Sequence, residues 1–158
     1  MKTFTQIHVA ISLIAIVTGL VVMFGLLLRN RLDRWTALFL LFTVATSVTG
    51  FFFPFHGFTP AIGVGIISML VLALAIFARY GRHLAGPWRW IYVITAMVAL
   101  YLNVFVLIVQ SFQKISILKA LAPTQSEPPF LFTQLITLLL FIVLSIVATI
   151  RFRPANVR

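Results

Sequence analysis

Residues 60–78 of the chain read PAIGVGIISMLVLALAIFA, a run that carries no polar stripe. A helix of a water-soluble domain presents a polar side every 3.6 residues, whereas this segment is apolar around its whole circumference. Its length matches the ~20 residues that cross a hydrocarbon layer ~30 Å thick. The segment therefore predicts a membrane helix.

Four more segments of the same kind lie along the chain, with charged residues at their ends. They are residues 7–28, 35–53, 88–109 and 130–150. By length, 158 residues fit one soluble domain, but 62% hydrophobic residues and a mean hydropathy of +1.15 belong to the membrane class. We predict an all-α fold, in which residues 1–158 form one integral membrane bundle of five transmembrane helices.

The basic residues separate by type along this pattern. Lysines flank one side of the predicted bundle, at Lys2, Lys114 and Lys119. The other side carries the arginines, which are Arg29, Arg31, Arg34, Arg79, Arg82, Arg89, Arg151, Arg153 and Arg158. Because short basic connections stay in the cytoplasm, the N-terminus is expected outside, the C-terminus in the cytoplasm, and residues 111–129 in an external loop. The first half of that loop has apolar residues at helical spacing, so the fourth helix is expected to continue outward or to lie in the interface, and prolines bound the second half.

Several function classes are disfavoured by composition. The formal charge of +10 lies in short turns, where lipid headgroups attract it, so nucleic acid is not an expected partner. The two carboxylates, Asp33 and Glu127, lie outside the apolar segments, which argues against an ion-coupled pump. There is no cysteine and no familiar catalytic motif. A non-enzymatic role is favoured.

Small residues recur at helical spacing on three segments. They form ladders at Ser12, Ala15 and Gly19, at Thr43, Ser47 and Gly50, and at Ala61, Gly65 and Ser68. Close backbone approach replaces the hydrophobic drive that lipid removes, so these ladders are expected to be helix contacts.

Amide side chains gather toward the predicted external side. Asn103 and Gln110 share one face of the fourth segment, with Gln134 on the fifth and Gln6 on the first. One interpretation is hydrogen bonding between helices. The other is a pocket near the external leaflet that binds a lipid, a quinone or another hydrophobic small molecule.

Two histidines are expected at the same membrane surface. His8 begins the first segment and His56 follows the second, so the two imidazoles are candidate axial ligands of haem b, or ligands of a metal together with Glu127. Interfacial histidines without any ligand are the alternative.

A basic cluster lies in the third connection. Arg79, Arg82, His83 and Arg89 are candidates for binding a phosphorylated headgroup at the cytoplasmic face. The positive-inside rule predicts the same residues without any ligand.

The opening Ile7-His8-Val9-Ala10, the pair Thr18-Gly19 and the basic turn before Trp35 resemble those of small bacterial inner-membrane proteins from families of unknown function. The resemblance implies a multi-pass protein of the bacterial cytoplasmic membrane and implies no activity. We expect a component that binds a hydrophobic small molecule or lipid, or an accessory subunit beside other membrane subunits. The alternative is a redox-linked protein that binds haem b or quinone through the histidines.

The charge pattern predicts where the two chain ends lie. A reporter fused after residue 158 is expected to be active in the cytoplasm, and one fused before residue 1 outside it, because the arginine-bearing connections resist translocation. Paired fusions of a periplasm-active and a cytoplasm-active enzyme measure this. Both ends in a single compartment would contradict the odd number of crossings.

Overall fold

The computed structural model describes residues 2–153, so Arg158 of the predicted arginine set lies outside the described residues. The fold is all-helical, with 81% of the chain in helices and no strand among the described residues. In chain order, the elements are α1 (Lys2–Leu27), α2 (Asp33–Gly50), α3 (Pro60–Ile76), η1 (Phe77–Gly81), α4 (Trp88–Lys114), α5 (Ser116–Leu121) and α6 (Pro128–Arg151).

Each of the five predicted apolar segments coincides with a long helix, although α1 ends at Leu27 and α2 at Gly50, before the predicted limits at residues 28 and 53. Within residues 2–153, four helices are long and apolar enough to cross a membrane: α1, α3 with η1, α4 and α6. The fifth, α2, has 18 residues and begins with Asp33 and Arg34, so its apolar part is shorter. The first half of residues 111–129 is helical, as its spacing predicted: it contains the end of α4 and the short helix α5, and α6 begins at Pro128.

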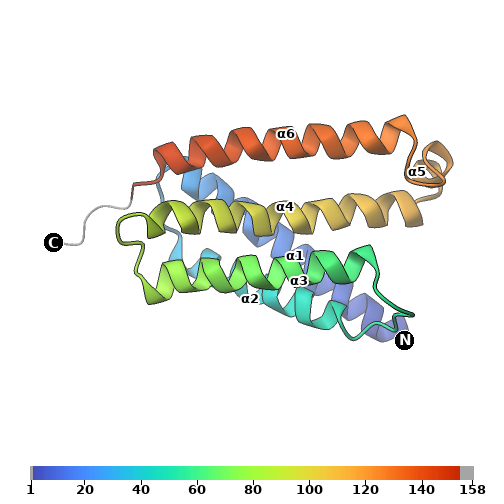
Figure 1. The fold of residues 1–158 in the computed structure, drawn as a ribbon, viewed down its shortest axis with the longest axis horizontal. Helices are drawn as coiled ribbons and strands as arrows, with labels where there is room; N and C mark the ends of the chain where they lie inside the picture. Colours follow the sequence, from blue (N-terminus) through green and yellow to red (C-terminus); the bar gives the residue numbers. More distant parts are fainter. Residues whose placement is uncertain (1, 154–158) are drawn as a thin grey trace.

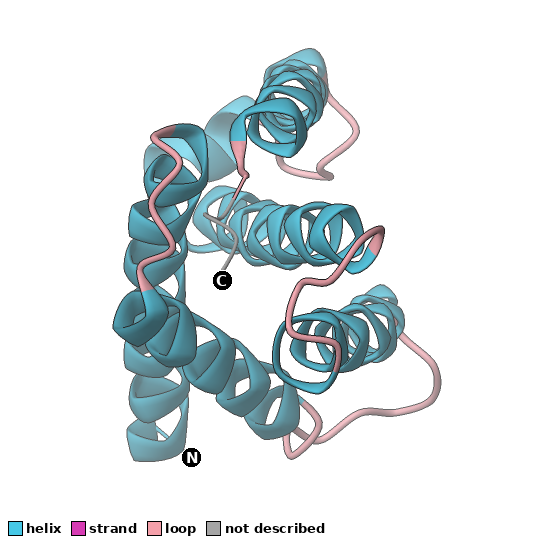
Figure 2. Ribbon diagram, turned by 90° about the vertical axis from the view of Figure 1, so that its left-hand side faces the viewer, coloured by secondary structure: helices cyan, strands magenta, loops and turns pink. Residues whose placement is uncertain are grey.

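Three of the long helices lie in a row, and the pair α1 and α2 packs against that row. Helices α3, α4 and α6 lie side by side with α4 in the middle (Figure 1). Helix α1 packs on α2 and crosses the row obliquely, in contact with α4 and α6 (Figure 2). The long helices run between the two ends of the bundle (Figure 1). We call one of them the lysine end, where α1 begins at Lys2 and α4 ends at Lys114. The other is the arginine end, where α2 begins at Asp33, η1 contains Arg79 and α6 ends at Arg151.

The core is concentrated toward the arginine end. Its cluster includes Met23 and Leu26 of α1, Phe39 of α2, Leu72 of α3 and Met97 of α4. By contrast, α6 buries only Phe130, Phe141 and Ala148, and it exposes a long run of aliphatic side chains. Such a helix needs an apolar solvent, which fits a position facing lipid.

The approach of α1 to its neighbours is set by Gly19, a member of the first predicted ladder. A Cβ at Gly19 would lie 2.6 Å from Cδ1 of Leu100 and 2.8 Å from Cε2 of Phe39. No side chain fits in that space, so α1 meets α2 and α4 with its backbone. Ala15, one turn earlier, is fully buried.

The turn after α1 is fixed by backbone hydrogen bonds. Arg29 has φ +63°, its N–H donates to the carbonyl of Leu26 (3.3 Å), and the N–H of Asn30 donates to Gly25 (2.8 Å). This is the Schellman pattern, in which the left-handed residue ends the helix. After this turn, Arg31 and Asp33 lie in contact with Arg79 of η1.

Gly19→Ala is expected to lower the free energy of unfolding by about 1–3 kcal/mol, because the added methyl must displace Leu100 or Phe39. Detergent-solubilised protein titrated with SDS and followed by circular dichroism measures this. Gly50→Ala is the matched control, since its Cβ would meet nothing closer than His8 Cε1 at 3.8 Å. Equal effects of the two substitutions would contradict the close approach at Gly19.

Candidate functional site

A groove opens between α1, α2, α3 and α4 in the half of the bundle nearest the lysine end, beyond the crossing at Gly19. We call it the lysine-end groove; its volume is about 550 Å³. This lies within the ~300–1,000 Å³ of typical small-molecule sites. Its lining consists of Thr5, His8, Val9, Ser12, Leu13, Ile16, Thr46, Ser47, Gly50, Phe51, Phe53, Phe55, Ala61, Ile62, Val64, Gly65, Ser68, Leu102, Asn103, Val106, Leu107, Gln110, Ser111, Lys114 and Ile115.

The deep part of the groove has its polar groups paired with one another. The Ser47 hydroxyl donates to the Ser68 hydroxyl (3.1 Å), which joins α2 to α3. The Asn103 amide donates to the Thr43 hydroxyl (3.2 Å), which joins α4 to α2. Both bonds are buried, so they hold the walls together in surroundings where an unpaired polar group is costly.

The predicted set of amides divides between the groove and other surfaces. Asn103 and Gln110 both line the groove, on the face of α4 that the spacing indicated. Gln134 is not in the lining; its amide donates to the carbonyl of Phe105 (3.3 Å) and joins α6 to α4. Gln6 is exposed near the start of α1, also outside the lining. Hydrogen bonding between helices is thus observed for Asn103 and Gln134, and ligand binding by the amides stays a prediction.

Lys114 is a groove residue that the sequence reasoning missed. It lies one helical turn after Gln110, on the last turn of α4, and its side chain reaches the groove. It forms no ion pair with any residue between 2 and 153. The four-residue spacing from Gln110 was the available signal, but Lys114 had been counted only as a topology marker.

His8 lies on the wall of the groove, whereas His56 lies exposed in the connection after α2. The Nδ1 atom of His8 lies 2.7 Å from the Thr49 hydroxyl, and the ring packs edge-on against Phe53, with 5.1 Å between centroids. These contacts fix the ring orientation. No group of three or more His, Asp or Glu side chains that could hold a metal ion occurs within the described range. A bis-histidine haem site stays a prediction.

Glu127 instead closes its own turn before α6. Its carboxylate accepts hydrogen bonds from the Thr124 hydroxyl (2.9 Å), from the Thr124 N–H (3.2 Å) and from the Ser126 N–H (3.1 Å). Desolvation alone would raise the pKa of the Glu127 carboxyl, but these hydrogen bonds together hold that pKa below its usual value. The carboxylate is therefore engaged within its own turn, and its role as a metal ligand beside the histidines stays a prediction.

Two of the four residues of the predicted headgroup cluster, Arg79 and Arg89, form hydrogen bonds within the protein. Arg79 is only 1% exposed; it donates to the Asp33 carboxylate and to the Arg31 carbonyl, and its guanidinium lies 5.0 Å from the Tyr92 ring centroid. Arg89 donates to the carbonyls of Thr149 and Phe152 at the end of α6. Both guanidinium groups are thus engaged by the protein itself, and binding of a phosphorylated headgroup by Arg79 and Arg89 stays a prediction.

Arg82 and His83 are the exposed members of that cluster. The Arg82 guanidinium lies 5.3 Å from the Trp88 ring centroid, and His83 lies in the turn after η1 with φ +50°. Binding of a phosphorylated headgroup stays a prediction for these two residues.

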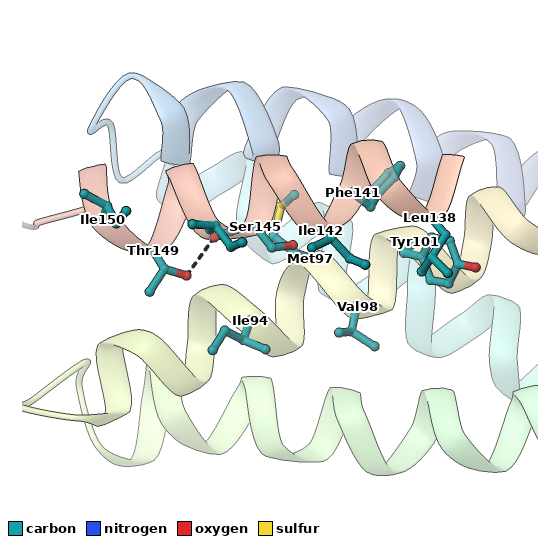
Figure 3. Close-up of a pocket in the computed structure, with 11 residues that line it drawn as sticks. Ile94, Met97, Val98, Tyr101, Leu138, Phe141, Ile142, Ser145, Thr149 and Ile150 are labelled. Carbon is teal, nitrogen blue, oxygen red and sulfur yellow. Dashed lines mark hydrogen bonds between the residues drawn. The ribbon is translucent and has the colours of Figure 1, made fainter. Parts of the chain in front are cut away.

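A second cavity, of about 440 Å³, lies between α4 and α6. Figure 3 shows that aliphatic and aromatic side chains such as Ile94, Val98 and Phe141 surround it. Its hydroxyl groups are few, and that of Thr149 donates to the backbone carbonyl of Ser145 (2.8 Å). Polar groups that orient a ligand are therefore scarce there, and the lysine-end groove is the stronger candidate.

Comparison with known proteins gives no further constraint on the site. No protein-family model, no curated protein and no solved structure matches the chain. The fold and the groove therefore define the class at this level: an all-helical protein with four helices able to span a membrane and a cavity with a polar rim at one end.

The Arg79 contacts predict that removing the Asp33 carboxylate destabilises the protein more than removing the neighbouring charge of Arg34. Asp33→Ala is expected to lower the free energy of unfolding by about 1–3 kcal/mol, because it removes the carboxylate partner of a buried guanidinium. The Asp33 side chain is 68% exposed, so the loss of stability is expected to be smaller than for a fully buried ion pair.

Arg34→Ala, which removes an exposed charge next to Asp33, serves as the control and should change stability by no more than about 0.5 kcal/mol. Thermal unfolding in detergent measures both variants. A melting temperature unaltered by Asp33→Ala would show that Arg79 does not depend on that carboxylate.

Proposed function

We propose that the protein is a multi-pass component of the bacterial cytoplasmic membrane that binds a hydrophobic small molecule or lipid in the lysine-end groove. The role is non-enzymatic. One observation carries the proposal: the groove is apolar over most of its wall and has polar groups from α1 and α4 at its rim, namely His8, Gln110 and Lys114. Apolar walls with a few orienting polar groups are the general form of small-molecule sites.

The proposed membrane arrangement has five crossings, with the N-terminus outside. In support of α2 as the fifth crossing, the 16 residues of α2 that follow Arg34 carry no charge and span about 24 Å as a helix, most of the ~30 Å hydrocarbon layer. In support of the orientation, the arginine end unites the first and third connections with the end of α6, through contacts from Arg79, Arg89 and Arg151. This arrangement puts the groove in the external leaflet.

Membrane lipid is a constant partner in this proposal, and an accessory role beside other membrane subunits is compatible with it. The exposed aliphatic face of α6 supports both, since either acyl chains or another membrane helix would cover it.

The haem or quinone alternative is separable by spectroscopy. A bis-histidine haem b would give purified protein a Soret band that His8→Ala removes, with His83→Ala as the exposed control. A quinone is itself a hydrophobic small molecule, so it would be one occupant of the groove, and extraction of purified protein with organic solvent would reveal it.

Val64→Phe is expected to reduce retention of the groove ligand, because Val64 lines the groove and the larger ring projects into it. Leu70→Phe is the matched control on the same helix; Leu70 is 68% exposed and is not in the lining. Mass spectrometry of protein purified from native membranes, with an unbiased inventory of bound small molecules, measures retention.

The proposal requires a species that copurifies with the wild type and with Leu70→Phe and is depleted in Val64→Phe. Thermal unfolding of all three proteins checks that Val64→Phe is folded. An identical inventory from the three folded proteins would refute binding in the groove.

A further inference from the structure

The rim of the lysine-end groove carries a cation with no counter-ion in the described chain. Lys114 lines the groove and is exposed, while the carboxylate nearest in sequence, Glu127, is held by Thr124 and Ser126 in its own turn. Asp33 lies at the opposite end of the bundle, against Arg31 and Arg79. An apolar groove with an unpaired ammonium at its rim is complementary to an amphiphile with an anionic head.

A neutral donor accompanies this charge. Gln110 lies one turn earlier on the same face of α4 and brings an amide to the rim. His8 also lines the groove, but the Thr49 hydroxyl donates to the Ala45 carbonyl (2.7 Å), so the His8 Nδ1–H donates to Thr49 and Nε2 of the neutral ring is an acceptor. The rim thus offers an anion one positive charge and one amide donor.

This donor set fits a carboxylate better than a phosphate. Phosphate groups are bound most effectively by arginine forks and by several positive charges together. Every arginine in the described residues lies at the arginine end or in its connections, far from the groove rim. A single lysine with one neutral amide donor matches a head that carries one negative charge.

The apolar part of the groove accommodates one chain. From Lys114 to Asn103, α4 runs 11 residues, or about 16 Å along the helix axis. The deep end is closed by Ile16, Ser68 and Asn103, which are all buried. A volume of about 550 Å³ corresponds to one elongated, drug-sized ligand.

We propose that the occupant of the lysine-end groove is a long-chain monocarboxylate, with its carboxylate at Lys114 and Gln110 and its chain directed toward Asn103. This assignment rests on the proposed function and names the class of ligand. The carboxylate lies where the rim meets water, and the chain replaces lipid or solvent in the groove.

Purified full-length protein in a non-ionic detergent, titrated separately with myristate and tetradecanol and followed by native mass spectrometry, tests the assignment. Wild-type protein is expected to bind one myristate per chain at least about fivefold more tightly than the uncharged alcohol, the factor that one charge contact near a membrane surface provides. Lys114→Gln is expected to remove this preference and to leave tetradecanol binding unchanged.

Lys119→Gln is the matched control, because it removes the same charge from exposed α5 outside the groove lining, and it should keep the preference. Loss of the preference in both lysine variants, or in neither, would overturn the assignment. Tighter binding of myristoyl lysophosphatidate than of myristate would overturn the choice of carboxylate.

The same titration separates this inference from the proposed function. If Val64→Phe weakens binding of both amphiphiles while Lys114→Gln has no effect, the groove binds ligands without recognising a carboxylate. If Val64→Phe leaves both affinities unchanged, the groove is not the binding site, and the proposed function fails together with the inference.

Discussion

The contact of α1 with α2 and α4 at Gly19 is the constraint on which the rest of the structure depends. There the backbone of α1 lies against Phe39 and Leu100, closer than any side chain allows. Helices that touch at one point and cross obliquely must separate on either side of it. On the arginine side, Met23, Leu26 and Tyr92 fill the widening space. On the lysine side, short residues such as Ser12, Ser47 and Ser68 leave it open as the groove.

The arginine end is held by interactions that complement this packing. The π-helical turn η1, in which the N–H of Arg82 donates to the carbonyl of Phe77 (2.9 Å), places Arg79 inward against Tyr92 and Asp33. Arg89 holds the last carbonyls of α6. The arginines from which the membrane orientation is predicted therefore also hold helices together. Arg79 and Arg89 have this packing role whichever way the protein is oriented.

The helices themselves were predictable from the sequence, because each apolar segment such as residues 60–78 needs an apolar solvent and charged residues interrupt the pattern. The face of α4 that bears Asn103 and Gln110 was also predictable, from the helical period alone. Three features were not. The burial of Arg79 depends on a π-helical turn, the position of Gln134 depends on which side of α4 receives α6, and the role of Lys114 depends on where α1 diverges. All three are tertiary relations between segments far apart in the chain.

The unequal packing of the two halves has a dynamic consequence. Amide protons exchange with solvent through local openings whose free energy rises with the number of buried apolar contacts around them. The part of α1 before Ala15 and the part of α4 after Asn103 have few buried residues, whereas the parts around Leu26 and Met97 have many. Subglobal openings of the lysine half are therefore expected to leave the arginine half in place. Under the proposed function, such openings would let an amphiphile enter and leave the groove while the protein stays folded.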